Sequence, residues 1–142
     1  MQMQSDFDRL GGGDKLRVII EDFVDRVVGD TMIGFHFRGV DMARLKTREW
    51  QLSARLLGAD VVYEGRSVRE AHARHPILGG QFMRRQQILK ETLTDHDVET
   101  AVIDRWLAHN ESMRGMVTGD EGSECDGEAA SAEVAAVRSR TD

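Results

Sequence analysis

Apolar residues recur every three or four positions along most of residues 5–118, the spacing that gathers them on one face of an α-helix. Glycines separate these segments, in place of the polar and apolar alternation that marks a half-buried strand. The pattern therefore predicts an all-α chain with a corner over 30–40 and a connecting loop over 59–66. We expect helices over 5–10, 15–28, 41–57, 67–75, 81–93 and 95–117.

Residues that commonly cap helices precede these segments. A capping side chain accepts a hydrogen bond from an otherwise unpaired N–H group in the first helical turn. Ser67 is followed by Glu70 at the capping-box spacing, and the only proline, Pro76, blocks continuation of that short helix. The expected caps are Ser5, Asp14, Asp41, Ser67 and, for the last helix, Thr94 or Asp95.

Length and charge favour one globular domain followed by an acidic tail. The 142 residues suit a single domain, which we expect over 1–118. Residues 119–142 hold seven acidic residues and two arginines, and so carry -5 of the formal net charge of -6. Because this segment lacks aromatic residues, we expect it to be disordered. The rest is nearly neutral and has no block of lysine and arginine, so nucleic-acid binding is not expected.

The composition also limits the cellular compartment and the kinds of functional site that we expect. The single cysteine, Cys125, can form neither an internal disulfide nor a zinc cluster, so we expect a protein of the reducing cytoplasm. Polar residues follow Met1 and the longest apolar runs are short, so we expect no signal peptide and no membrane association. No segment has the residue spacing of a serine hydrolase.

A carboxylate interrupts the apolar face of the 41–57 helix. Burying a carboxylate is costly unless it is paired, protonated or facing a polar cavity. One interpretation is an ion pair between Glu49 and Lys46 at the edge of the core, since Lys46 borders the same face. The face is formed by Met42, Leu45, Glu49, Leu52 and Leu56.

The segment SVREAHARHPI at 67–77 carries two histidines one helical turn apart. His72 lies on an apolar face with Val68, and such a histidine is either hydrogen-bonded in a core or a ligand. His75 lies beside Pro76, nearer the rim of the helix. The pair has a spacing that zinc accepts, but no further Cys, His or Asp set completes a site.

The order of these features resembles the truncated haemoglobins, the shortened 2-on-2 globins, over nearly all of residues 5–118. The resemblance is to the group 1-like bacterial members and implies a globin-like 2-on-2 helical sandwich that binds haem b. The segments that carry it are FDRLGG at 7–12, EDFVDRVVGD at 21–30, FHFRGVDMARLK at 35–46, LLGADVVYEGR at 56–66 and VREAH at 68–72.

The resemblance implies roles for individual residues. His72 takes the place of the proximal histidine, whose neutral imidazole nitrogen binds haem iron. Phe37 matches the phenylalanine that packs on the porphyrin. Lys46 and His75 match positions whose side chains can reach a propionate at the haem rim. The other positions that match the haem wall are Phe23, Leu45, Tyr63, Val68, Ile77 and Phe82.

The sequence departs from the family on the distal side, where the gas ligand is handled. Val24 stands where a tyrosine commonly donates a hydrogen bond to the ligand, and Glu49 stands where a glutamine is frequent; Leu52 completes the expected distal pocket. An ionised Glu49 disfavours dioxygen, which gains partial negative charge on ferrous haem, whereas a protonated Glu49 could donate the missing hydrogen bond. We therefore expect fast oxygen release or ready oxidation, and a function in oxygen, nitric oxide or redox handling rather than storage.

Several alternatives stay open. Lys46, if desolvated and neutral, could be a sixth iron ligand with Glu49 orienting it, and His36 is a second candidate for that position. A haem-free globin-fold module for sensing or interaction would also explain a charge at Glu49. Nitric oxide dioxygenase or peroxidase activity would need distal acid–base groups. The expected partners are a diatomic gas (O2, NO or CO) and an electron-donating reductase, with the chain a monomer or weak dimer.

Overall fold

A computed structural model describes residues 4–73 and 77–118 of the chain. Every regular element in these residues is helical, which confirms the all-α prediction. His75, Pro76 and the expected tail at 119–142 lie outside the described residues. The elements are α1 (Asp6–Leu10), α2 (Gly13–Val28), the 3-10 helix η1 (Gly34–Phe37), α3 (Met42–Leu56), α4 (Val68–His72), α5 (Gly79–Asp95), α6 (Thr100–Ser112) and α7 (Arg114–Thr118).

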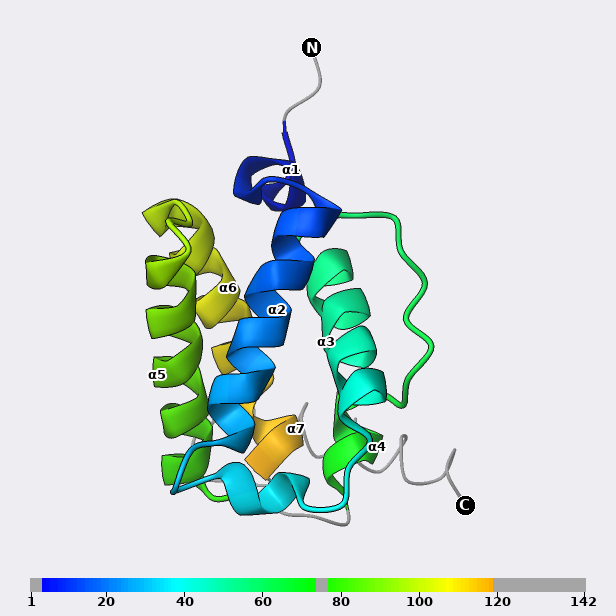
Figure 1. Ribbon diagram of the computed structural model, residues 1–142, viewed down its shortest axis with the longest axis vertical. Coiled ribbons are helices and arrows are strands. Elements are labelled where there is room, and N and C mark those ends of the chain that lie inside the picture. Colours follow the sequence, from blue (N-terminus) through cyan, green and yellow to red (C-terminus); the bar gives the residue numbers. More distant parts are fainter. Residues whose placement is uncertain (1–3, 74–76, 119–142) are drawn as a thin grey trace.

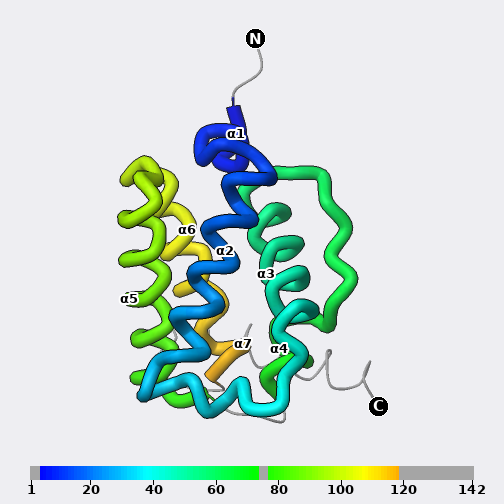
Figure 2. Tube along the Cα trace, viewed as in Figure 1, coloured from blue at the N-terminus to red at the C-terminus, as the bar shows by residue number. Residues whose placement is uncertain are grey.

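Helix α2 lies at the centre of the fold, between α3 on one side and α5 on the other (Figure 1). Helix α6 packs against α5, so that two pairs of long helices, α2 with α3 and α5 with α6, form the body. The segment 57–67 runs along the outside of α3 and returns the chain to the short helix α4 (Figure 2). Helix α4 packs on α7 at the end of the molecule where η1 also lies.

Three of the expected helix caps are present. The side chains of Ser5, Asp41 and Ser67 accept hydrogen bonds from backbone N–H groups three residues later, at 3.1, 3.2 and 3.1 Å. Each bond satisfies one donor that the helix itself leaves free, so each helix begins where its cap predicts.

The expected cap at Asp14 is wrong. Helix α2 begins two residues earlier than expected, at Gly13, after Gly11 and Gly12 with φ values of 123° and 87°. These left-handed conformations suit glycine, and they turn the chain sharply from α1 into α2. Asp14 lies instead inside the first turn, where a negative charge favours the helix dipole.

The expected single helix over 95–117 is also wrong. Helix α5 continues through Asp95, and within it the Thr94 hydroxyl donates to the Lys90 carbonyl at 2.8 Å, so Thr94 does not cap the next helix. A turn follows in which Asp97 has a positive φ of 58°, and Glu99 is the N-terminal boundary residue of α6. A break at Met113 then separates α6 from α7.

The core is continuous along α2, α5 and α6, since apolar residues of all three helices belong to one buried cluster. Burying these side chains removes them from water and supplies the main favourable free energy of folding. The most deeply buried large side chains are Leu16, Ile19, Ile20, Leu89, Leu93, Val102 and Thr92.

An ion pair joins the corner after α2 to the start of α5. The Nε and Nη2 groups of Arg84 donate to Asp30 Oδ1 at 3.0 and 2.8 Å. Backbone N–H groups of Met32 and Ile33 donate to Asp30 Oδ2 at 3.0 and 3.2 Å. The Arg84 hydrogen bonds, with help from these backbone donors, hold the pKa of Asp30 below its ordinary value.

Replacing Leu89 by alanine should lower the free energy of unfolding by about 2–5 kcal/mol, because the side chain is 1 % exposed and its removal leaves a cavity between helices. Val18→Ala is the control: Val18 is 55 % exposed, and its change should be within about 0.5 kcal/mol. Urea unfolding followed by circular dichroism measures both, and equal effects would contradict the packing described.

Replacing Asp30 by asparagine should destabilise the protein at neutral pH, because Arg84 loses its anionic partner. The folded-state pKa of Asp30 is lowered, so its carboxylate stabilises the fold above the ordinary aspartate pKa and stops doing so as the pH falls through the lowered value. The stability difference between the two proteins should therefore shrink in acid. Asp60→Asn, in an exposed loop position, is the control. A difference independent of pH in urea titrations would refute this assignment.

Candidate functional site

A small cavity lies where α2, η1, α3 and α5 meet. Five of its seven lining residues are apolar, and the other two form a charged pair on α3 and α5. An apolar cavity with a few polar groups is the usual form of a small-ligand site. The lining residues are Phe23, Val24, Val27, Phe37, Leu45, Glu49 and Arg85.

The cavity brings together five of the residues that the sequence assigned to the distal pocket and the haem wall. Helix α2 supplies Phe23 and Val24, η1 supplies Phe37, and α3 supplies Leu45 and Glu49. Leu52, one turn farther along α3, does not line the cavity. The wall also contains two residues that were not expected.

Val27 and Arg85 differ in whether the sequence pattern could have predicted that they line the cavity. Val27 follows Phe23 and Val24 at helical spacing on the buried face of α2, so its place could have been predicted. Arg85 carries no such signal, since α5 has arginines at both 84 and 85 and only the packing of α5 decides which one faces the cavity.

Glu49 and Lys46 have separate partners, so the expected pair between them is wrong. Arg85 Nη2 donates to the two carboxylate oxygens of Glu49 at 3.3 and 3.4 Å. Lys46 Nζ lies 2.8 Å from Asp25 Oδ1 on α2. Lys46 is thus held on the outer side of the α2–α3 pair, and the charge of Glu49 is balanced from α5.

His72 is held in one tautomer by its own helix. Its Nδ1 lies 2.7 Å from the carbonyl oxygen of Val68, one turn earlier. A carbonyl can only accept, so Nδ1 carries the proton and Nε2 keeps a lone pair. Ser67 caps this short helix and so fixes the direction of the ring.

Burial lowers the pKa of His72 below its ordinary value, so the imidazole is neutral at physiological pH. The positive charge of Arg85 and the nearby His36 lower this pKa further, whereas the Val68 carbonyl and Glu49 act in the opposite direction. These influences also show that His72 lies within electrostatic reach of the Glu49–Arg85 pair on the cavity wall.

The other residues that the sequence assigned to the haem wall differ in burial and in their contacts. Phe82 is buried at 4 % exposure with the Arg114 guanidinium 5.7 Å from its ring centre, and Val68 and Ile77 are half-buried. Tyr63 donates its hydroxyl to the Arg66 carbonyl at 2.6 Å, so its polar end is turned onto its own loop.

The two polar candidates for a sixth ligand are both engaged elsewhere. The His36 Nε2 donates to Gln81 Oε1 at 3.2 Å, and Gln81 Oε1 also accepts from the Leu78 backbone N–H at 2.9 Å. Lys46 is paired with Asp25 as described above. Neither side chain lines the cavity.

The donor set fits haem. A neutral histidine with a free Nε2 lone pair and a hydrogen-bonded Nδ1–H is a standard axial ligand of haem iron. The cavity has a volume of about 10 Å³, which is room for one water-sized molecule and is far too small for the porphyrin. No group of three His, Cys, Asp or Glu side chains in the described residues could hold a bare metal ion.

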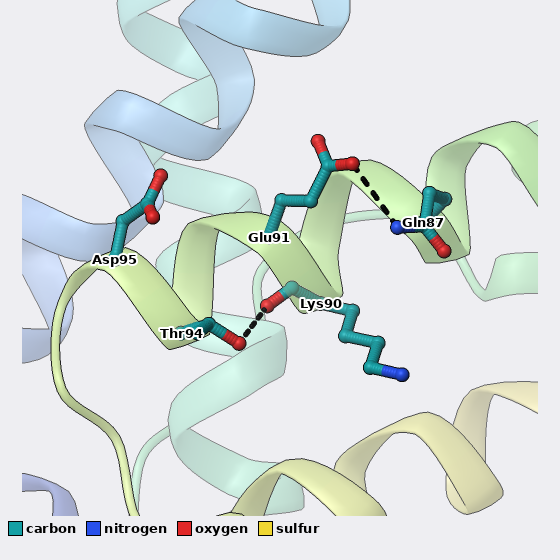
Figure 3. A pocket seen from close by; sticks show the side chains of 5 residues that line it. All are labelled: Gln87, Lys90, Glu91, Thr94 and Asp95. Carbon is teal, nitrogen blue, oxygen red and sulfur yellow. Dashed lines mark hydrogen bonds between the residues drawn. The ribbon is translucent and has the colours of Figure 1, made fainter.

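A hollow on the outer face of α5 is a different kind of feature. Its lining residues all come from one helix, and two hydrogen bonds join residues four positions apart along it (Figure 3). These are Gln87 Nε2 to Glu91 Oε1 at 3.0 Å and the Thr94 hydroxyl to the Lys90 carbonyl at 2.8 Å. With no second wall, the hollow is solvated helix surface.

Helix lengths and hydropathy do not indicate a membrane-spanning element. Among the helices of the described residues, none combines the length and the apolar character that a bilayer crossing needs.

Sequence comparison finds similar proteins over most of the chain. The family model described as bacterial-like globin matches residues 5–119. Group 1 truncated hemoglobin GlbN of Mycolicibacterium paratuberculosis is 35% identical over 66 residues, covering 46% of this chain. That match spans 48% of the relative, about half its length. Group 1 truncated hemoglobin GlbN of Synechocystis is 29% identical over 105 residues, 71% of this chain and 85% of that relative.

Solved structures match the whole arrangement of helices. The truncated hemoglobin from Tetrahymena pyriformis in its Fe(III) form has a TM-score of 0.76 and 25% identity, over 82% of this chain and 100% of that one. The 2/2 hemoglobin from Synechococcus, in the cyanomet state and with covalently attached heme, has a TM-score of 0.77 and 24% identity over the same shares. The predicted 2-on-2 helical sandwich is thereby confirmed.

Proposed function

The chain belongs to the bacterial-like globin family, and from that premise we propose that it binds haem b with His72 as the axial ligand and takes up a small diatomic gas at the cavity beside Glu49. Truncated globins generally bind haem and gas ligands. The observation that carries the proposal is the single tautomer of His72, with Nδ1–H on the Val68 carbonyl at 2.7 Å and Nε2 left as a donor to iron.

Bound haem supplies an iron centre that takes up the gas and changes oxidation state. The chain's own part begins with His72. Because burial lowers its pKa, the imidazole needs to lose no proton before it binds iron at neutral pH. The Val68 carbonyl keeps the ring from rotating, so the direction of Nε2 is set before haem arrives.

The cavity supplies an apolar surrounding for the gas. Val24 offers no hydrogen-bond donor, and Phe23, Val27, Phe37 and Leu45 give the same space apolar walls. The Glu49 carboxylate would disfavour a ligand that gains negative charge, but Arg85 lies 3.3 Å from it and offsets that charge. This pocket lacks the family's usual tyrosine donor, which supports oxygen, nitric oxide or redox handling rather than long-term oxygen storage.

A use in redox handling requires a source of electrons. Ready oxidation leaves ferric iron, and an electron-donating reductase would have to return it to the ferrous form. We propose such a reductase as the partner of the haem-loaded protein.

His72→Gly should weaken haemin binding by about tenfold or more, because Nε2 is already hydrogen-bonded in His36 and His96, and His109 is exposed on α6. The Soret band of the purified protein should disappear, and added imidazole, which can occupy the space left by the side chain, should restore it.

His109→Ala is the matched control, since His109 is exposed on α6 and should leave the spectrum unchanged. A His72→Gly protein that keeps the ferrous–carbon monoxide spectrum of the unaltered chain would exclude His72 as the iron ligand. A colourless unaltered protein that does not take up haemin would exclude haem binding altogether.

A further inference from the structure

Arg85 is the cationic side chain of the cavity wall. It comes from α5, the element opposite the Glu49 helix, and its guanidinium carbon lies 4.9 Å from the centre of the Phe23 ring. Stacking on an aromatic face holds a guanidinium in one plane while leaving its N–H groups free at the edge. Arg85 is therefore oriented by an apolar neighbour and by an anion together.

The ion pair to Glu49 uses only part of the Arg85 donor set. A guanidinium has five N–H donors, and only Nη2 reaches Glu49, at 3.3 and 3.4 Å to the two oxygens. In the described part of the chain, Nε and Nη1 of Arg85 make no hydrogen bond. Charge-assisted pairs with optimal geometry are shorter, about 2.7–2.9 Å.

The neighbouring Arg84, on the same helix, forms an ion pair with shorter and better-placed hydrogen bonds. Arg84 donates from Nε and Nη2 to one oxygen of Asp30 at 3.0 and 2.8 Å. Its partner also accepts two backbone hydrogen bonds, so that pair is complete. Arg84 does not line the cavity, whereas Arg85 does, and Nε and Nη1 of Arg85 make no hydrogen bond within the described residues.

We propose that Arg85 is the specificity-determining residue of the gas site and makes it a site for small anionic ligands of ferric haem. This inference rests on the proposed function, because it places the anion in the cavity served by His72. The ligand class is a small monoanion, of which azide is the probe. Its negative end would accept hydrogen bonds from the N–H groups of Arg85 that Glu49 does not use.

The chemistry of the wall explains the preference for anions. Five of the seven lining residues are apolar, and the side chains of Arg85 and Glu49 are 31% and 24% exposed, so water weakens a hydrogen bond between the guanidinium and an anion less here than on open surface. A neutral ligand such as carbon monoxide accepts hydrogen bonds poorly and gains much less. Among the described residues that line the cavity, Arg85 alone combines a positive charge with free donors.

Glu49 acts in the opposite direction on the same ligand. Its carboxylate holds Arg85 in place but repels an entering anion and competes for the guanidinium. Removing the charge at Glu49 should therefore strengthen anion binding, whereas removing Arg85 should weaken it. If the Glu49–Arg85 pair had only a structural role, each substitution would change the affinities for azide and for carbon monoxide alike.

The experiment compares azide binding to the ferric holoprotein with carbon monoxide binding to the ferrous holoprotein. Arg85→Gln should raise the azide Kd by at least about tenfold and change the carbon monoxide Kd by less than about threefold. Glu49→Gln should lower the azide Kd by about threefold or more. The C–O stretching band should move to higher frequency in Arg85→Gln, because a positive charge beside the ligand is lost.

Arg84→Gln is the control on the same helix and should leave the ratio of azide to carbon monoxide affinity unchanged. If Arg85→Gln fails to take up haem, Glu49→Gln is compared with the double variant Glu49→Gln/Arg85→Gln, in which no charge is left unpaired. The double variant should again bind azide about tenfold or more weakly than Glu49→Gln.

An azide Kd for Arg85→Gln within about twofold of the unaltered value would overturn the inference, and so would equal losses for azide and carbon monoxide. In a protein that binds haem through His72, either result leaves the proposed function intact. An unaltered protein that takes up no haemin overturns both.

Discussion

Helix α2 has to bury side chains on two sides at once, because it packs against α3 on one side and α5 on the other. Its first turns put Leu16, Ile19 and Ile20 into the core at 1 % exposure or less. Its last turns put Phe23, Val24 and Val27 over the cavity. The same helix thus supports the core and forms one wall of the site, so the wall is as rigid as the core that holds it.

The close approach of the first pair of helices depends on a residue without a side chain. A Cβ at Gly13 would lie 3.3 Å from the Trp50 ring, and the Trp50 indole N–H donates to the Gly13 carbonyl at 3.0 Å. Helix α3 thus meets the start of α2 at Trp50, while Leu45 and Glu49 of the same helix line the cavity with residues from the second half of α2.

The site depends on one interaction that is local in the chain and one that is long-range. His72 is oriented by its own short helix, through the Ser67 cap and the Val68 carbonyl, so no distant element is needed to aim it. The charge of Glu49 is instead balanced by Arg85, which is 36 residues away in the chain. The first interaction orients the histidine that we propose as the iron ligand, and the second sets the electrostatic character of the cavity.

The residues near one another in the chain were enough to predict an all-α chain, three caps and the short helix that carries His72, because those features depend on hydrogen bonds within four residues and on the 3.6-residue period. They did not predict the breaks that divide the expected helix over 95–117. The resemblance to the truncated haemoglobins grouped Phe23, Val24, Phe37, Leu45 and Glu49 around one site, and these five residues line one cavity. Neither the local pattern nor the resemblance determined the partner of Glu49. Lys46 is close to it in the chain, but the packing of α2 beside α3 gives Lys46 to Asp25, and the packing of α5 brings Arg85 rather than Arg84 to the cavity. Adjacent helical residues point in directions about 100° apart, so only the tertiary structure decided which arginine faces the ligand site.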